Sequence, residues 1–164
     1  MPVTVSNEHP RLRVDQRAIA RQLRLVLKHV GQPRGIIDVL LTDDDEIRQL
    51  NRDYRGRDEI TDVLSFAIQD DPEDPGVIPH LGDIVISLDT ADRQARLMPH
   101  TTDMKRWRLR EEVLFLAVHG ALHLLGYDHR TDEQALEMEA LERHLFASVS
   151  GLDPHALARQ THGF

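Results

Sequence analysis

A chain of 164 residues suits one compact domain, and its net charge of −8, from 20 basic and 28 acidic residues, argues mildly against an unspecific polyanion-binding protein. Hydrophobic residues make up 40% of the chain and aromatic residues only 4%, so the core must consist mainly of aliphatic side chains. The lack of cysteine excludes disulfides and thiolate metal sites, which leaves histidine and carboxylate as ligands for any metal.

The amino-terminal sequence carries charged residues where a signal peptide needs an uninterrupted apolar stretch, and nothing elsewhere approaches a membrane-spanning run. We therefore expect a cytoplasmic protein that makes no contact with a membrane. The chain has no repeat, low-complexity tract or long linker. We expect residues 1–164 to form a single domain, with residues 151–164 as a peripheral tail.

The first third of the chain predicts alternating strands and helices. Residues 2–6 suit a short strand, and apolar residues recur at helical spacing between positions 15 and 30, until the run GQPRG ends the pattern. Residues 36–42 (IIDVLLT) predict a buried strand because they are apolar and rich in β-branched side chains. A helix over residues 44–51 should follow, and its candidate N-caps are Thr42 and Asp43.

The middle of the chain predicts two further strands, over residues 61–68 and 83–87, separated by a loop rich in proline and acidic residues. Residues 88–98 favour a helix that ends before Pro99. Residues 102–125 hold the longest apolar helical pattern, which indicates a central buried helix. These elements together indicate an α+β fold.

The last predicted helix is amphipathic and follows a capping-box pair. Thr131 and Gln134 form that pair, and apolar residues recur at helical spacing from Leu136 to Phe146.

The segment HGALHLLGYDH carries the most informative chemistry. His119 and His123 are four residues apart on the predicted central helix, so both imidazoles project from one face and can reach a single ion. Gly126 can adopt a positive φ, end the helix and return His129 to the same point. Three protein ligands with an open fourth position are typical of catalytic zinc, which activates water. We therefore predict a zinc-dependent hydrolase.

Two other interpretations of these histidines have to be weighed. A histidine pair alone is more often surface chemistry or satisfied core polarity, but an unbound polar group within the apolar run VLFLAVHGALHLLG costs about 1–3 kcal/mol. The spacing H-x-x-x-H-x-x-G-x-x-H equals that of metzincin proteases, which need a glutamate directly after the first histidine. Gly120 stands at that position, so peptide hydrolysis by that route is disfavoured.

The segment HGALHLLGYDH closely resembles the signature of the bacterial YbeY endoribonucleases, which are rRNA maturation factors. The sequences LNRDYRGRDEITDVLSFAI (residues 50–68) and HLGDIVIS (residues 80–87) are similar to two further conserved blocks of that family, and DEQALEMEALE resembles its closing helix. The resemblance covers residues 36–145 well, whereas the first thirty residues and the tail carry little diagnostic pattern.

The resemblance implies a small mixed sheet, which we expect to have four strands, with about five helices around it. It also implies one zinc ion held by His119, His123 and His129, and hydrolysis of single-stranded RNA rather than DNA. Family members are linked to maturation of the 3′ end of 16S rRNA and to ribosome quality control, so rRNA and the small ribosomal subunit or its proteins are the expected partners. A ribosome-assembly factor with a mainly structural zinc remains an alternative, and a metalloprotease is a less favoured one.

The resemblance assigns Arg55 as the motif arginine of a Tyr-Arg pair. Its planar guanidinium suits a scissile phosphate, and the alternative is an ordinary surface arginine. Arg52 and Arg57 flank it and give local support to phosphate binding.

Other residues near the motif keep two interpretations each. Asp128 can hydrogen-bond a ligand imidazole or cap a turn, and Glu112 can support the metal site or act as a base, although a helix-surface carboxylate is more common. The segment KRWRLR (residues 105–110) can contact RNA, but a core position is favoured for Trp107. The general base is therefore not assigned.

Overall fold

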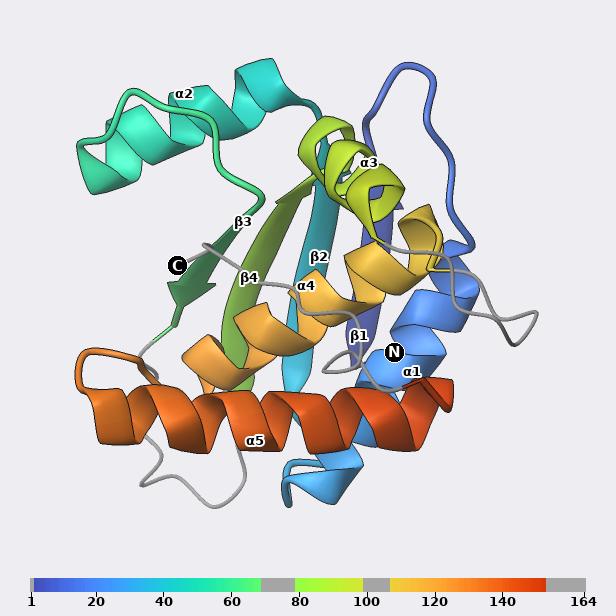
Figure 1. Cartoon of the computed structure of the whole chain (residues 1–164), viewed down its shortest axis with the longest axis vertical. Coiled ribbons are helices and arrows are strands. Elements are labelled where there is room, and N and C mark those ends of the chain that lie inside the picture. The colour runs from blue at the N-terminus through green and yellow to red at the C-terminus, as the bar shows by residue number, and fades with distance from the viewer. Residues whose placement is uncertain (1, 69–78, 99–106, 153–164) are drawn as a thin grey trace.

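The computed structural model describes residues 2–68, 79–98 and 107–152. Four strands and five helices lie within these ranges (Figure 1). In chain order they are β1 (Val3–Asn7), α1 (Gln16–His29), β2 (Ile36–Thr42), α2 (Asp44–Arg55), β3 (Val63–Ala67), β4 (His80–Ser87), α3 (Leu88–Leu97), α4 (Leu109–Leu124) and α5 (Asp132–Ser150). None of these helices is long and apolar enough to cross a membrane.

The strands form one mixed sheet in the order β1-β2-β4-β3. β1, β2 and β4 run parallel, and β3 pairs antiparallel with β4 at the outer edge of the described sheet. Both parallel connections need a crossover, and α1 and α2 lie in them. The predicted α+β class and four-stranded mixed sheet with five helices are confirmed.

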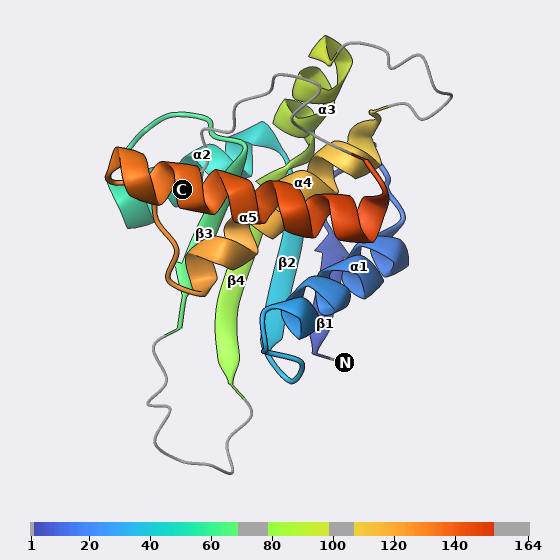
Figure 2. The same ribbon diagram turned by 60° about the horizontal axis from the view of Figure 1, so that its bottom comes forward.

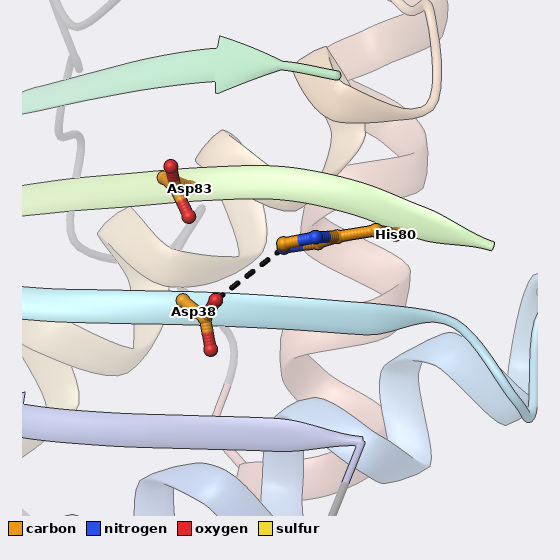
Figure 3. Close-up of side chains that lie close together, drawn as sticks. All are labelled: Asp38, His80 and Asp83. Carbon is orange, nitrogen blue, oxygen red and sulfur yellow. Dashed lines mark ion pairs between the residues drawn. The ribbon is translucent and has the colours of Figure 1, made fainter. Parts of the chain in front are cut away.

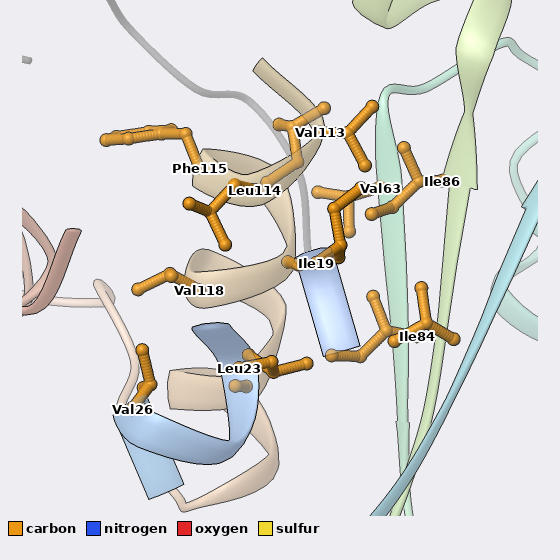
Figure 4. Packing of buried hydrophobic residues seen from close by; sticks show 14 of the residues in the cluster. Ile19, Leu23, Val26, Val63, Ile84, Ile86, Val113, Leu114, Phe115 and Val118 are labelled. Carbon is orange, nitrogen blue, oxygen red and sulfur yellow. The ribbon is translucent and has the colours of Figure 1, made fainter. Parts of the chain in front are cut away.

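The main hydrophobic core lies between one face of the sheet and the helices α1 and α4 (Figure 4). Side chains alternate along each strand, so Val39 of β2 and Ile84 of β4 point into this core. The helix α5 crosses over α4 on the side away from the sheet (Figures 1 and 2). Since α4 also contacts α1 and α3, it is surrounded on all sides, which explains why its sequence is apolar all round. The predicted central buried helix is confirmed.

The opposite face of the sheet is covered in part by α2. Ile47 of α2 packs there against Leu64 of β3 and Val85 of β4 in a smaller cluster. Asp38 of β2 lies on the same face of the sheet, beyond this cluster, and is half exposed. The two faces of the sheet therefore differ in chemistry, because one is mainly apolar and the other turns polar towards the start of β4.

Three predicted boundaries differ from the structure by three residues or more, and others by one or two. The helix α2 continues to Arg55, beyond the predicted end at position 51, because its last turn is polar and exposed and ends only where Gly56 adopts φ 70°. The strand β4 begins at His80 instead of position 83 because it pairs with β2 along its whole length. The helix predicted over residues 102–125 is observed from Leu109, and residues 99–106 lie outside the described ranges.

The predicted loop before β4 and the predicted tail fall largely on residues that are not described, 69–78 and 153–164. The assignment of residues 1–164 to one domain with a peripheral tail from position 151 therefore stays a prediction.

Candidate metal centre

The three histidines of the motif come together at the carboxyl end of α4. His119 and His123 lie one turn apart on the helix, with ring centroids 4.7 Å apart. The ring of His129 lies 5.3 Å from that of His123 and 6.3 Å from that of His119, centroid to centroid. The prediction that three imidazoles converge on one region agrees with these positions.

A glycine turn brings His129 back to the helix. Gly126 has φ 98°, and its N–H donates to the carbonyl of His123 at 3.0 Å, while the N–H of Tyr127 donates to the carbonyl of Leu122 at 3.0 Å. These two bonds form the Schellman motif that commonly ends helices at glycine. The predicted positive φ at Gly126 is thus observed.

Two of the imidazoles have one ring nitrogen fixed by an acceptor. His123 Nδ1 lies 3.0 Å from the carbonyl oxygen of Tyr127, and His119 Nδ1 lies 3.2 Å from Oε2 of Glu142 on α5. A backbone carbonyl can only accept, so Nδ1 of His123 carries the proton and its Nε2 keeps a lone pair, and an ionised Glu142 carboxylate favours the same tautomer for His119. This is the tautomer that a metal-ligating histidine needs.

The two Nε2 atoms lie 3.2 Å apart. Tetrahedral zinc with Zn–N bonds of about 2.0–2.1 Å places two ligand nitrogens roughly 3.3 Å from each other, so the spacing fits two ligands of one ion. Burial, together with the neighbouring imidazoles of His119 and His129, lowers the pKa of His123 to about 4. His123 is therefore neutral at pH 7, as a ligand must be.

Glu142 is the residue of this site that the sequence reasoning missed. It is buried on α5, on the same face of the helix as Met138 and Leu145, which are both core residues. A carboxylate on the apolar stripe of an amphipathic helix is unusual, because a buried charge needs a partner. That contrast was the signal that could have found it.

Asp128 and Glu112, the two acidic residues considered in the sequence analysis, make their hydrogen bonds outside the three imidazole rings. Asp128 accepts the backbone N–H of His129 at 2.8 Å and pairs with Arg130 at 2.7 Å, and the bond from His129 lowers the pKa of Asp128. It therefore caps the turn. Glu112 is fully buried and accepts from Nε1 of Trp107 at 2.7 Å, so it is not a helix-surface carboxylate.

Trp107 is a core residue, as the sequence favoured. It is 7% exposed, and its ring lies 5.0 Å from that of Phe146 and 6.1 Å from that of Phe115, centroid to centroid. The preceding residues Lys105 and Arg106 of the KRWRLR segment lie outside the described ranges.

Arg55, the last residue of α2, is tied to the outer strand of the sheet. Its Nη2 donates to the backbone carbonyl of Ser65, and the Oγ of Ser65 donates to the carbonyl of Gly120 at 3.2 Å. Two hydrogen bonds thus connect Arg55 to the residue that follows His119. The side chain of Arg55 is exposed at this position and accessible to a ligand.

The two neighbouring arginines differ from Arg55. The Nε of Arg52 lies 3.3 Å from Oδ1 of Asp53, and Nη1 of Arg57 lies 3.9 Å from Oε1 of Glu59, in exposed ion pairs. Their charges are partly compensated by these carboxylates.

Gly120 has a structural reason to lack a side chain. A Cβ added there would lie 3.0 Å from both the Oγ of Ser65 and the Cγ2 of Ile84, because α4 approaches the sheet closely at this point. A glutamate, which the protease mechanism needs here, would require the side chains of Ser65 and Ile84 to give way by a few tenths of an ångström. The packing therefore agrees with the absence of the protease base.

Among the described residues, a group whose ligand atoms lie close enough together to hold a metal is found on the opposite face of the sheet (Figure 3). It consists of Asp38 on β2 and of His80 and Asp83 on β4, whose ligand atoms all lie within 4.8 Å of one another. His80 Nε2 is 3.3 Å from Asp38 Oδ2, and Thr4 donates to the other carboxylate oxygen. Nitrogen and oxygen donors of this kind suit divalent cations.

The sequence reasoning did not single out this group. Asp38 and Asp83 are far apart in the chain and become neighbours only through the parallel pairing of β2 with β4. Asp83 is exposed, and Asp38 and His80 are partly exposed, although Nε2 of His80 is itself buried. At the end of α4, His119 is buried, His123 and His129 are partly exposed, and acceptors hold His119 and His123.

Comparison with known proteins decides the family. Residues 4–150 match the family model described as Endoribonuclease YbeY. The chain belongs to the YbeY endoribonuclease family. The YbeY endoribonuclease of Anaeromyxobacter sp. is 43% identical over 157 residues, which cover 96% of this chain and 76% of that protein. The YbeY endoribonuclease of Syntrophotalea carbinolica is 40% identical over 150 residues, which cover 90% of this chain and 95% of that protein.

The fold agrees with a solved structure as well. The solution structure of TM1509 from Thermotoga maritima matches with a TM-score of 0.60 and 25% identity, and the match covers 91% of this chain and 89% of that one. The resemblance inferred from the histidine motif and the two further blocks is thus confirmed for almost the whole chain. The YbeY family is a family of RNA-hydrolysing enzymes, which agrees with the predicted enzyme class.

Proposed function

We propose that the protein is a single-strand-specific endoribonuclease that depends on one zinc ion held by His119, His123 and His129. The observation that carries the proposal is the 3.2 Å separation of the His119 and His123 Nε2 atoms, with both Nδ1 atoms held by acceptors. Zinc bound there would supply Lewis-acid activation of water and of a phosphoryl oxygen. Family membership indicates that the scissile bond is a phosphodiester bond of RNA.

Arg55 acts on the substrate in this proposal. Its bond to the Ser65 carbonyl uses one N–H of a guanidinium that has five, so further donors remain for a phosphate. The anchored side chain loses little freedom when it binds, and its charge stabilises the negative charge that develops on the scissile phosphate. Glu142 and the Tyr127 carbonyl keep two ligand imidazoles oriented during the reaction.

We further infer that the substrate is rRNA, with maturation of the 3′ end of 16S rRNA and ribosome quality control as the processes served. The small ribosomal subunit or its proteins would then be the partners, in the cytoplasm, without a role for DNA or for a membrane. The support for these assignments is the family, since the relatives named above are YbeY endoribonucleases.

The test measures metal content and cleavage in the same preparations. Purified protein should contain about one zinc per chain and should cut a single-stranded rRNA fragment but not the same sequence annealed into a duplex. The variant His119→Ala should lose both zinc and cleavage, whereas His144→Ala, at an exposed position on α5, should keep both. Undiminished cleavage by His119→Ala would contradict the proposal.

The arginine variants separate substrate binding from metal binding. Arg55→Ala should keep its zinc and lose about 10²–10³-fold in kcat, as expected when one donor to a developing anion is removed. Arg52→Ala should lose far less, because Arg52 already faces Asp53. A fourth zinc ligand from a protein side chain, seen by X-ray absorption or crystallography, would favour a structural zinc and an assembly factor instead.

A further inference from the structure

An exposed aromatic pair adjoins Arg55 at the outer edge of the sheet. Tyr54 is 70% exposed, and its ring contacts that of Phe66 on β3 edge to face, with centroids 5.5 Å apart and an angle of 70° between the planes. The guanidinium carbon of Arg55 lies 5.5 Å from the centroid of the same Phe66 ring. A single exposed tyrosine is unremarkable on a protein surface, but this one shares a ring contact with the phosphate-binding candidate.

We propose that Tyr54 and Phe66 form a stacking subsite for one unpaired nucleobase of the RNA, beside the phosphate bound by Arg55. This inference rests on the proposed function and adds a binding site to it. Nucleobases stack on aromatic side chains with little regard to their identity, and each such contact is worth about 1–3 kcal/mol. Bases within a duplex are paired and stacked on one another, so they cannot enter the subsite, which contributes to selection of single strands.

The position of the subsite follows from the alternation of side chains along β3. The side chain of Ser65 points to α4 and Gly120, next to His119, whereas that of Phe66 points to the face covered by α2. Arg55 lies between these faces because it bonds the Ser65 carbonyl and contacts the Phe66 ring. A phosphate on Arg55 is thus placed between the metal centre on one side of the strand and the aromatic pair on the other.

Charge determines which way the RNA continues from the subsite. Phe66 pairs in register with Asp83, and Asp83 with Asp38, so two carboxylates follow the aromatic ring across this face of the sheet. Figure 3 shows them beside His80, which pairs with Asp38. Without a bound cation, these carboxylates repel phosphates that would cross the sheet. The RNA therefore follows the edge at β3 instead of crossing towards β2.

The test compares Tyr54→Ala with Tyr54→Phe on metal-loaded full-length protein. The substrate is a single-stranded rRNA oligonucleotide, and a series with one abasic residue at each position around the cut tests the role of each base. Loss of one stacked base corresponds to about a 5- to 150-fold weaker interaction. Tyr54→Ala should therefore raise KM by a factor in that range with little change in kcat, and Tyr54→Phe should recover most of the loss.

The abasic series gives the decisive readout. For the wild type, one abasic position next to the cut should raise KM by a similar factor, and Tyr54→Ala should be insensitive to that same position, because the two changes remove one contact. Equal sensitivity of both proteins at every position would overturn the subsite. A drop in kcat without a change in KM would also overturn it, since that result would mean that Tyr54 only positions Arg55.

Controls distinguish a failure of the proposed subsite from a failure of the proposed function. Leu97→Ala, at a position 84% exposed on α3, should match the wild type in KM, kcat and zinc content. Cleavage by the wild type with unchanged behaviour of Tyr54→Ala would reject the subsite alone. Absence of both cleavage and binding of the single-stranded oligonucleotide in the wild type would reject the proposed function and the subsite with it.

Discussion

The orientation of two imidazoles is set by residues that the motif does not contain. His123 is held by a backbone carbonyl of its own turn, whereas His119 is held by Glu142, which comes from another helix. A carboxylate that accepts from Nδ1 fixes the ring and makes Nε2 a stronger electron donor. The metal affinity of the motif therefore depends on the correct packing of α5 as well as on the histidines.

The variant Glu142→Ala tests this dependence. It removes the acceptor of His119 Nδ1, and we expect the zinc affinity to fall about 10- to 100-fold. The zinc affinity of Glu142→Gln should lie between those of Glu142→Ala and the wild type, because an amide oxygen still accepts a hydrogen bond. Competition titration against a chromogenic chelator measures the affinity. Glu139→Ala, on the exposed side of α5, is the matched control. Equal zinc affinity in Glu142→Ala and Glu139→Ala would show that the contact has no part in metal binding.

Sequence patterns predicted the helix ends and strands that depend on residues close together in the chain. Asp43 and Thr131 cap α2 and α5 through bonds to the backbone N–H groups of Glu46 and Gln134, at 2.9 and 3.1 Å, and the strand predicted over residues 36–42 is β2. These signals lie within a few residues of one another, so one sequence suffices to find them. The nearness of the three imidazoles was predictable for the same reason.

Features that arise between elements were not predictable in this way. Glu142 contacts His119 only because α5 lies across α4, and Asp38 approaches Asp83 only because β2 and β4 are neighbours after a crossover. The full length of β4 depends likewise on its pairing with β2. A pattern within one segment carries no information on which other segment it packs against, so these contacts needed the structure.

The start of α2 and the start of α3 are joined by one carboxylate. Asp44 accepts from the hydroxyls of Ser87 and Thr90, at 2.6 Å each, and from Nη2 of Arg93 at 2.8 Å. Burial raises the pKa of Asp44, but these three hydrogen bonds and the charge of Arg93 outweigh it and hold the pKa below the ordinary value of 3.8. Asp44 therefore stabilises the folded state as long as it is ionised.

A pH-dependent loss of stability follows for Asp44→Asn. A carboxylate whose pKa is lowered by folding stabilises the protein above its unfolded pKa, and that stabilisation is lost as the pH falls through the folded value. We expect Asp44→Asn to lower the free energy of unfolding by about 1–3 kcal/mol at pH 7 and by much less near pH 3. Urea unfolding at both pH values measures the difference. Asp45→Asn, exposed in the same helical turn, should show little change, and an equal deficit of Asp44→Asn at both pH values would contradict the assignment.

At the scale of the whole molecule, the candidate metal centre lies where α4, the link that follows it and α5 meet. His119 and His123 belong to α4, His129 to the link that follows, and Glu142 to α5, which packs over α4 away from the sheet (Figure 2). An ion bound by the three histidines would bind only the folded arrangement of these segments. In the proposed site, metal binding and folding would therefore be thermodynamically linked.

This linkage predicts a metal-dependent melting temperature. Zinc at one hundred times its dissociation constant should stabilise the fold by about 2.7 kcal/mol, which for a domain of this size raises Tm by roughly 5–10 °C. Removal of zinc with a chelator, followed by calorimetry before and after zinc is added back, measures the shift. His119→Ala should show none of it, because it lacks a ligand, whereas His144→Ala should show all of it. A shift of equal size in His119→Ala would mean that zinc stabilises the protein elsewhere, and Asp38→Ala would then determine whether the cluster on the opposite face of the sheet is that place.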